Sequence, residues 1–435
     1  MLLCTIYVLA PYISNVVIGD PVRGQALISS WHTISGVIIA VTSAFLGAAT
    51  DRMGRRKPLL ALIVAVLAVS IFVQWWAVPG EGGLPLGVLG FVVIVSSIAF
   101  VYSEVLHNAM LTRAAHPAVL SHVSGLGLSL GNLASVLLLV FVLATIALPG
   151  QMDLPLIPDA PLFGLDPAAY EPSRIVAPLC AIWLIVFSIP LFLYTPDLTT
   201  TGERFGDAMR HGVGNVIRTI SKLRDYRNVA LFLVARMLYA DGKTAILIFS
   251  GIYAAGVMQW GLIEMLAYGV ILTIFAVFGG FIGGWLDHAL GPKRAVVIEL
   301  GAVLACLIAM VSMTFASMLF VIPVDPEARI WNSPLFATAP ELGYMGFAIV
   351  IAIFITAAYA SSRTLMARLA PEGMEGEVFG LYALAGSATA WLGPMLVEYF
   401  TSTYQSQRAG FASIAILLLL GFVLLLFVKP PAAKH

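Results

Sequence analysis

The chain has 435 residues, of which 60% are hydrophobic and 11% are charged. Soluble proteins are about 45–50% apolar and about 25% charged, so this composition excludes an ordinary water-soluble domain and indicates an integral membrane protein. The 23 basic and 23 acidic residues cancel, which gives no support to a nucleic-acid or other polyanionic partner.

Apolar segments long enough to cross a membrane follow one another along the chain. A spanning helix needs roughly 20 apolar residues. Six candidate spans lie near residues 1–18, 25–49, 58–79, 84–110, 119–148 and 174–195. Six more lie near residues 229–257, 262–287, 295–323, 341–368, 377–400 and 409–429. The sequence therefore predicts an all-α membrane protein with 12 transmembrane helices in two six-helix bundles.

A polar stretch between the two sets of spans divides the chain into three expected parts. Residues 1–195 form the N-terminal bundle, residues 196–228 a linker, and residues 229–435 the C-terminal bundle. The linker is basic and has apolar residues at helical spacing, which predicts a short amphipathic helix on the membrane face. The apolar N-terminus has no basic region and no AxA-type cleavage site, so a span is expected there rather than a signal peptide.

Lysine and arginine are distributed unevenly between the two predicted sides of the membrane. Loops on the side of residues 51–57 hold 17 of the 23 basic residues, whereas the opposite loops hold 4. Since cytoplasmic loops are enriched in Lys and Arg, this bias predicts that both termini and the linker are cytoplasmic.

The loops after the second and the eighth span resemble each other. They read "GAATDRMGRRKP" at residues 47–58 and "GGWLDHALGPKR" at residues 283–294. Each has an acid, a turn glycine and basic residues at the same place in its half, which indicates an internal duplication of the kind found in secondary transporters. The two bundles are therefore expected to be pseudo-symmetric. The motif residues are Gly47, Asp51, Arg52, Gly54, Arg55, Arg56, Asp287, His288, Gly291, Lys293 and Arg294.

The loop at residues 47–57 closely resembles the signature loop of the major facilitator superfamily. In that family the loop latches the two halves together on the cytoplasmic side. The resemblance implies that Asp51 interacts with a helix N-terminus across the interface, where the helix dipole favours a carboxylate. The second copy departs from the pattern, because His288 stands where the acid should be and Asp287 is displaced by one position. We therefore expect the latch role for Asp51.

Within the superfamily, several stretches resemble the vacuole-effluxer-like branch, which comprises autophagy-related vacuolar amino-acid exporters and bacterial counterparts. These stretches are "HVSGLGLSLGNL", "LFLVARMLYADGKTAILIFSGIYAAGV", "RTLMARLAP", "FGLYALAGSATAWLGP" and "SQRAG". The resemblance implies an exporter of small organic solutes, with amino acids the leading class, in a bacterial inner (plasma) membrane. In "SEVLHNAM" the chain departs from the branch, with Glu104 and His107 where relatives usually carry Asn and Tyr. The first span is also short, so its cytoplasmic half is expected to be missing.

In the superfamily, the first span of each three-span unit lines a central cavity. An ionisable residue facing lipid costs roughly 2.5–3.5 kcal/mol or more, so such residues should face a wet cavity or a partner. The resulting candidates for solute binding or coupling are Tyr102, Glu104, His107, Asn108, Arg236, Tyr239, Asp241, Lys243, Tyr359 and Ser362.

The seventh span carries the most charge. On a regular helix Arg236 and Lys243 lie two turns apart on one side. Asp241 and Lys243, two residues apart, point to nearly opposite sides and cannot pair. Either Gly242 breaks the helix, or each charge finds a partner on another helix. Glu104 is the expected acidic partner of Arg236 or Lys243. A purely structural role for Asp241 and Lys243 stays open.

The predicted function is secondary active transport of a small organic solute by alternating access, with export and proton coupling through Glu104 or Asp241 as further hypotheses. The chain is not expected to be an enzyme, because it has no Ser/His/Asp constellation, HExxH motif or Walker-type loop. An uptake carrier for sugars or peptides and a non-transporting receptor or scaffold remain alternatives. We expect no cofactor and no bound metal. The expected partners are the solute, protons and the lipid bilayer, with no nucleic acid and with the chain as a monomer.

Overall fold

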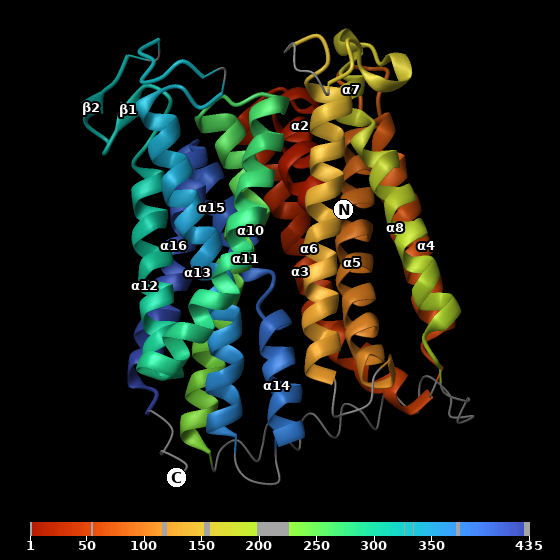
Figure 1. Cartoon of the computed structure of the whole chain (residues 1–435), viewed down its shortest axis with the longest axis vertical. Coiled ribbons are helices and arrows are strands. Elements are labelled where there is room, and N and C mark those ends of the chain that lie inside the picture. Colours follow the sequence, from red (N-terminus) through yellow and green to blue (C-terminus); the bar gives the residue numbers. More distant parts are fainter. Residues whose placement is uncertain are drawn as a thin grey trace.

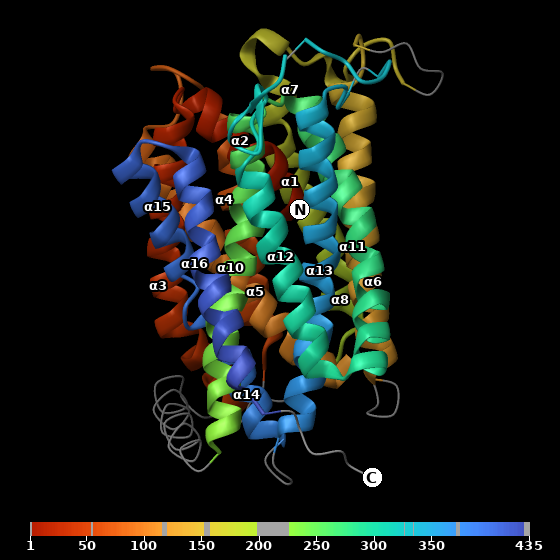
Figure 2. The same cartoon turned by 90° about the vertical axis from the view of Figure 1, so that its left-hand side faces the viewer.

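The computed structural model describes residues 2–53, 55–114, 120–151, 157–197, 226–325, 327–333, 335–370 and 375–429. The amphipathic helix predicted in the linker lies outside the described residues, as does Gly54. Long helices run along one common axis (Figures 1 and 2). One end of this bundle carries α7, β1 and β2, and we name it the α7 end; α14 lies toward the opposite end, which we name the α14 end.

The described residues before residue 198 contain helices α1 to α8. Their bounds are α1 (Leu2–Cys4), α2 (Ala10–Tyr12), α3 (Pro21–Met53), α4 (Lys57–Val73), α5 (Leu86–Ala114), α6 (Leu120–Val142), α7 (Glu171–Arg174) and α8 (Val176–Tyr194). π-helical turns occupy Thr5–Leu9, Ile13–Val17 and Leu143–Ala147, and 3-10 turns occupy Gln74–Trp76, Leu162–Gly164 and Pro167–Ala169. The turns around Pro11 make the first helix irregular, because proline has no N–H for the helical ladder.

The segment after residue 225 contains the remaining elements. Their bounds are α10 (Arg227–Val257), α11 (Leu262–Leu290), α12 (Pro292–Val311), β1 (Ser317–Met318), β2 (Ile322–Pro323), α13 (Ala339–Leu369), α14 (Glu375–Ser387), α15 (Leu392–Tyr404) and α16 (Gln407–Phe427). The two strands form one antiparallel pair in the loop between α12 and α13.

Nine helices of the described residues are long and apolar enough to cross a membrane. Only helices satisfy every backbone group within one spanning segment, so an apolar chain of this kind folds into helices in lipid. Three further predicted spans fall outside that count: the shorter apolar helix Leu2–Val17, the charged helix α10, and the pair α14 and α15. The number of twelve spans therefore stays a prediction.

Buried apolar side chains gather in two clusters. One is built from residues between Cys4 and Ala181, with Leu266 as its single member from the later segment. The other is built mainly from residues between Val229 and Val428, together with first-helix side chains such as Tyr7 and Tyr12. The first helix thus contributes to both clusters and lies where they meet.

Two predicted spans differ in the structure. The span expected at residues 295–323 ends at Val311, because Ser and Thr side chains of the following loop bond locally and compete with helical bonding. Thr314 Oγ1 and Ser317 Oγ lie 2.6 Å apart in that loop. The span expected at residues 377–400 is interrupted between Ser387 and Leu392, where Pro394 cannot donate to the carbonyl of Ala390.

Helix α10 is continuous through Gly242, so the break considered for the seventh span is absent from it. A Cβ at Gly242 would lie 3.0 Å from Cγ and Cδ2 of Leu418 on α16. The absence of a side chain at Gly242 therefore allows α16 to pack closely against α10. The interruption lies instead in the neighbouring eleventh span, between α14 and α15.

Candidate functional site

Helix α10 holds three charged side chains inside the protein. Arg236 is 7% exposed, Asp241 2% and Lys243 1%. Removing such groups from water costs several kcal/mol per ion unless partners compensate for it. Each of the three finds its partners on a different helix, so the second of the two alternatives raised by the sequence is confirmed.

Arg236 is bound to α14. Its Nη1 donates to the carbonyl oxygen of Tyr382 at 2.6 Å, and its Cζ lies 3.5 Å from the centroid of the Tyr382 ring. A Cβ at Gly386, one turn further along α14, would lie 3.2 Å from Nη1, so that glycine leaves room for the guanidinium group. A desolvated cation–π contact contributes about 2 kcal/mol. Arg236 therefore holds α14 against α10.

Lys243 is surrounded by aromatic rings. Its Nζ lies 4.0 Å from the ring centroid of Tyr359 and 5.4 Å from that of Tyr239. Tyr239 Oη is 2.9 Å from Ser362 Oγ, which joins α10 to α13. Tyr359 is 40% exposed, so its ring separates the buried ammonium group from the exposed face of α13. Lys243 forms no ion pair with a carboxylate of the described residues.

Asp241 is bound to the break in the eleventh span. Its Oδ2 accepts a hydrogen bond of 2.8 Å from the backbone N–H of Gly393, in the first turn of α15. Thr389 Oγ1 donates to Met237 O at 3.0 Å and ties the interrupted residues to the same helix. A carboxylate is favoured at a helix N-terminus by the helix dipole. The other oxygen, Oδ1, is buried and has no hydrogen-bond partner among the described residues.

Glu299 on α12 belongs to the same interior, although the cavity-lining rule did not select its helix. Its side chain is 0% exposed, and Oε1 accepts a 2.8 Å hydrogen bond from Ser361 Oγ on α13. Its Oε2 has no partner among the described residues. Glu299 is also the acid whose charge acts on Lys243. The only sequence signal for it was an acid in the middle of an apolar span.

The described side chains predicted on the fourth span, those of Tyr102, Glu104 and His107, are not bound to the α10 charges. Glu104 and His107 on α5 are exposed, and Tyr102 Oη bonds to Thr42 Oγ1 on α3. The expected ion pair of Glu104 with Arg236 or Lys243 is wrong for this structure, because those cations are bound within the later segment. Arg363 on α13 is the cation close enough to act on Glu104. The side chain of Asn108 lies outside the described part.

The first motif loop lies only partly within the described residues. Gly47, Asp51 and Arg52 lie on α3, but their side chains are outside the described part, so the latch role of Asp51 stays a prediction. The N-terminus of α4 binds an acid that the sequence did not single out. Asp197 accepts from the backbone N–H groups of Arg56 at 3.1 Å and Lys57 at 2.9 Å. Arg55 is exposed.

The second motif loop forms a tight corner. Gly291, with φ of +81°, ends α11 and directly precedes α12. Lys293 Nζ donates to Leu426 O at 2.9 Å, and Arg294 and His288 are exposed. Asp287 is buried within α11, and its Oδ1 has no partner among the described residues. The motif therefore acts here as a helix-to-helix turn.

The segments before and after residues 198–225 are hydrogen-bonded to each other near the α7 end. Gln25 Nε2 on α3 donates to Thr401 Oγ1 at 2.8 Å and to Gln407 O at 3.1 Å. Gln407 Nε2 donates to Pro21 O at 2.9 Å. All three side chains, those of Gln25, Thr401 and Gln407, are buried. We name this set of bonds the glutamine clamp.

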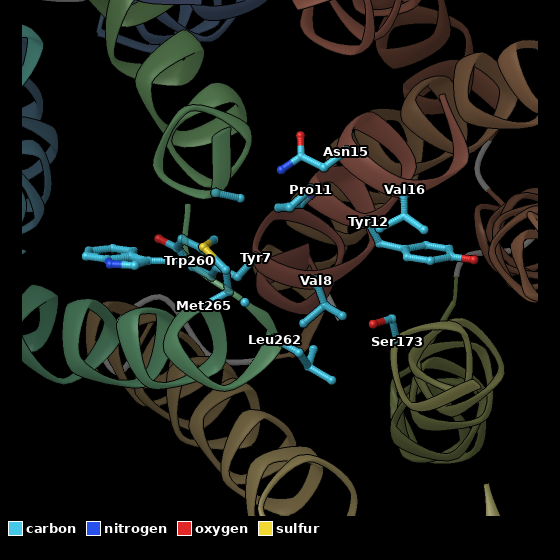
Figure 3. Close-up of a pocket in the computed structure, with 12 residues that line it drawn as sticks. Tyr7, Val8, Pro11, Tyr12, Asn15, Val16, Ser173, Trp260, Leu262 and Met265 are labelled. Atoms are coloured by element: carbon cyan, nitrogen blue, oxygen red, sulfur yellow. The ribbon is translucent and has the colours of Figure 1, made fainter. Parts of the chain in front are cut away.

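A cavity of about 120 Å³ lies near the same end of the bundle. Figure 3 shows the first helix on one side of it, with Tyr7, Tyr12 and Asn15, and Trp260 and Met265 from the α10–α11 junction on the other. Tyr7 and Tyr268 meet edge to face with ring centroids 5.4 Å apart. Asn15 Oδ1 is buried without a partner among the described residues. The cavity thus lies where the first helix meets the junction of α10 and α11.

Comparisons with known proteins agree on one family. The family model described as vacuole effluxer Atg22 like matches residues 112–435. Autophagy-related protein 22 of Coccidioides immitis is 23% identical over 274 residues, which are 60% of this chain and 43% of that relative. The chain therefore spans less than half the length of this fungal relative. The uncharacterized MFS-type transporter YxiO of Bacillus subtilis is 22% identical over 397 residues, 91% of this chain and 82% of the relative.

Solved structures with a similar fold are also transporters. The nucleoside transporter NupG aligns with a TM-score of 0.65 at 13% identity, covering 98% of this chain and 94% of that one. The xylose transporter XylE from E. coli, in an inward open conformation, aligns with a TM-score of 0.61 at 11% identity, covering 100% and 95%. The structural likenesses show that the chain has the fold of these solved transporters, and the family match shows that it belongs to the Atg22-like vacuole effluxer family.

Proposed function

We propose that the protein is a secondary active transporter that exports a small organic solute, with amino acids the leading class, by alternating access. The observation that carries this proposal is the interior of α10. This predicted span holds Arg236, Asp241 and Lys243 in the protein interior, where they contact α14, α15 and the Tyr359 ring of α13. A packing helix has no need of three such charges, since ionisable groups within a membrane are costly and mark transport pathways.

The interrupted eleventh span supports the same function. Irregular backbone at membrane depth is tolerated where it is buried in protein or lines a cavity, and carriers use broken helices at their solute sites. Here the break between α14 and α15 is bound by Asp241 and Thr389 and packs against α3, since a Cβ at Gly36 would lie 2.7 Å from Ala390 O. Movement of α10 relative to α3 would therefore act on this break.

Alternating access requires the two predicted bundles to separate at one end at a time. In this structure the glutamine clamp and the ring contact of Tyr7 with Tyr268 join the two segments near the α7 end. In the topology proposed from the distribution of basic residues, with cytoplasmic termini, this is the extracytoplasmic end. Export then requires the clamp to open once per cycle and release the solute there. We place the protein in a bacterial inner membrane.

The proposal includes proton coupling through a carboxylate inside the membrane. An acid whose cationic partner changes with conformation can take up a proton in one state and release it in the other. Glu104, near Arg363, and Asp241, at the N-terminus of α15, are the acids proposed for this role from the sequence. Transport with unchanged dependence on the pH gradient in both Glu104→Gln and Asp241→Asn would exclude them.

The experiment that tests the function is a flux measurement in proteoliposomes. Vesicles loaded with a tritiated amino-acid mixture are placed under an imposed pH gradient, and wild type is compared with Asp241→Asn and with protein-free vesicles. We expect gradient-dependent loss of label with wild type and a lower rate with Asp241→Asn. Parallel vesicles with labelled sugars and dipeptides test the uptake carrier. If no solute moves with wild type, the receptor or scaffold alternative replaces the proposal.

A further inference from the structure

Glu299 is the most completely enclosed carboxylate of the α12–α13 interface. Its side chain is 0% exposed, and its one hydrogen bond joins Oε1 to Ser361 Oγ. The second oxygen, Oε2, has no partner among the described residues. A buried carboxylate with an unpaired oxygen bears the cost of desolvation without full compensation, unless it carries a proton or receives a cation.

A short run of buried polar side chains leads from Glu299 to Lys243. Ser361, bonded to Glu299, is followed on α13 by Ser362, which bonds to Tyr239 of α10. The Tyr239 ring is in turn one of the two rings beside the Lys243 ammonium group. Glu299, Ser361, Ser362, Tyr239 and Lys243 are each at most 1% exposed. A carboxyl group and an amino group are therefore enclosed in one interior, together with the hydroxyl groups of Ser361, Ser362 and Tyr239.

The groups around Glu299 can be named for each neighbouring helix. Helix α11 contributes Asp287, whose charge acts on Glu299, and α10 contributes Lys243. Arg236 acts on Lys243 from the same helix, where it is bound to Tyr382. Helix α13 contributes Ser361 and, beside Lys243, Tyr359. In α16, which also packs on α12, the titratable residue is Arg408 in the first turn. Among these groups, Lys243 is thus the cation that can offset the desolvation cost of an ionised Glu299.

In this structure the two groups do not compensate each other by contact. Lys243 lies against the Tyr359 ring and forms no ion pair within the described residues. A Lys side chain has a flexible four-carbon stem, so a rotamer change moves its charge by several ångströms without moving the backbone. The position of the ammonium group, toward Glu299 or toward Tyr359, therefore decides which form of the carboxyl group is favoured.

We propose that Glu299 binds the coupling proton of this carrier and that Lys243 controls its release. When the ammonium group of Lys243 approaches Oε2, the carboxylic acid loses its proton to water and the carboxylate pairs with the lysine. When Lys243 returns to Tyr359, Oε2 takes up a proton again. This inference rests on the proposed transport function, but it assigns the proton to α12, outside the helices expected to line the cavity.

The first test needs only protons. Infrared difference spectra of purified protein between acid and alkaline pH should contain the C=O band of a carboxylic acid in an apolar environment. Glu299→Gln should remove that band, whereas Glu398→Gln, which changes a half-buried carboxylate on α15, should leave it. If Glu299→Gln does not fold, Ser361→Ala keeps the carboxyl group and should shift the band frequency, because it removes the hydrogen bond to Oε1. An unchanged band in either Glu299 or Ser361 variant overturns the proposal.

The second test uses the tritiated amino-acid mixture in proteoliposomes. Glu299→Gln should retain exchange of label without a gradient and lose the additional flux that a pH gradient drives. Lys243→Met should lose the gradient-driven component as well. Gradient-driven flux at the wild-type level in Glu299→Gln contradicts the inference while leaving the transport function intact. If wild type moves no label, the proposed function and solute class fail, and the infrared result alone decides the role of Glu299.

Discussion

Replacing Gln25 with leucine should shift the protein toward a state that is open at the α7 end. Gln25 is 0% exposed and donates two hydrogen bonds across the interface, to Thr401 Oγ1 and to Gln407 O. Leucine has a similar volume and an apolar side chain, so it removes these bonds without leaving a large cavity. Gln25 Oε1 has no partner among the described residues and loses nothing in the exchange.

The size of the shift follows from the two bonds. Each intramolecular hydrogen bond contributes about 0.5–1.5 kcal/mol net, so the closed state should lose about 1–3 kcal/mol. That free energy corresponds to a change of about 5- to 150-fold in the ratio of open to closed molecules. Thr401→Val removes only one of the two bonds and should give about half of the free-energy change.

The assay is a distance measurement between spin labels at the α7 end. Trp76 is 48% exposed in the earlier segment and Tyr404 is 64% exposed at the end of α15, so both accept labels after substitution by cysteine. The three native cysteines are replaced first. Gln151→Leu, at an exposed loop glutamine, is the matched control. We expect a longer-distance population that grows in Gln25→Leu and not in Gln151→Leu. Identical distance distributions in both variants would refute the clamp.

Two further predictions concern the packing of α10. Gly242→Val should destabilise the protein by about 1–3 kcal/mol, because a Cβ there already lies 3.0 Å from Leu418, and its melting temperature in detergent should fall. Gly280→Val, at a helical glycine with no neighbour within 4 Å, is the control, and an equal loss in both would contradict the packing role. Arg236→Lys should lose about 2 kcal/mol, because lysine cannot keep both the Tyr382 carbonyl and the ring contact. A double-mutant cycle with Tyr382→Leu measures this coupling, and strict additivity would argue against it.

The helical membrane fold followed from the sequence because its signal is long-range and redundant. Apolar runs of about 20 residues specify spanning helices irrespective of packing detail. The predictions that were wrong concern where helices end or are interrupted, because these positions depend on local hydrogen bonds. The loop after Val311 is apolar enough to look like a span, yet its Ser and Thr hydroxyls bond to each other. The break considered at Gly242 is absent, because α16 packs closely against that glycine, and the interruption lies instead before Pro394 in the eleventh span.

The sequence predicted the charged residues of the candidate site, but it did not predict the groups that bind them. Helical phase alone separated Asp241 from Lys243, and the structure confirms that they bind different helices. The sequence could not predict that Asp241 binds the backbone N–H of Gly393, because every residue except proline has such a donor and only the fold selects one. Glu299 was not among the candidates for solute binding, because its span does not begin one of the predicted three-span units. Burial, which only a structure supplies, brings it next to Ser361.

The most direct test of the carrier function is trans-stimulation of exchange. Proteoliposomes are loaded with the tritiated amino-acid mixture at equal pH on both sides, and unlabelled amino acids are then added outside. An alternating-access carrier returns its site faster when it is loaded, so we predict that external amino acids accelerate the loss of internal label with wild type and not in protein-free vesicles. Loss of label at a rate that external amino acids leave unchanged would contradict the account.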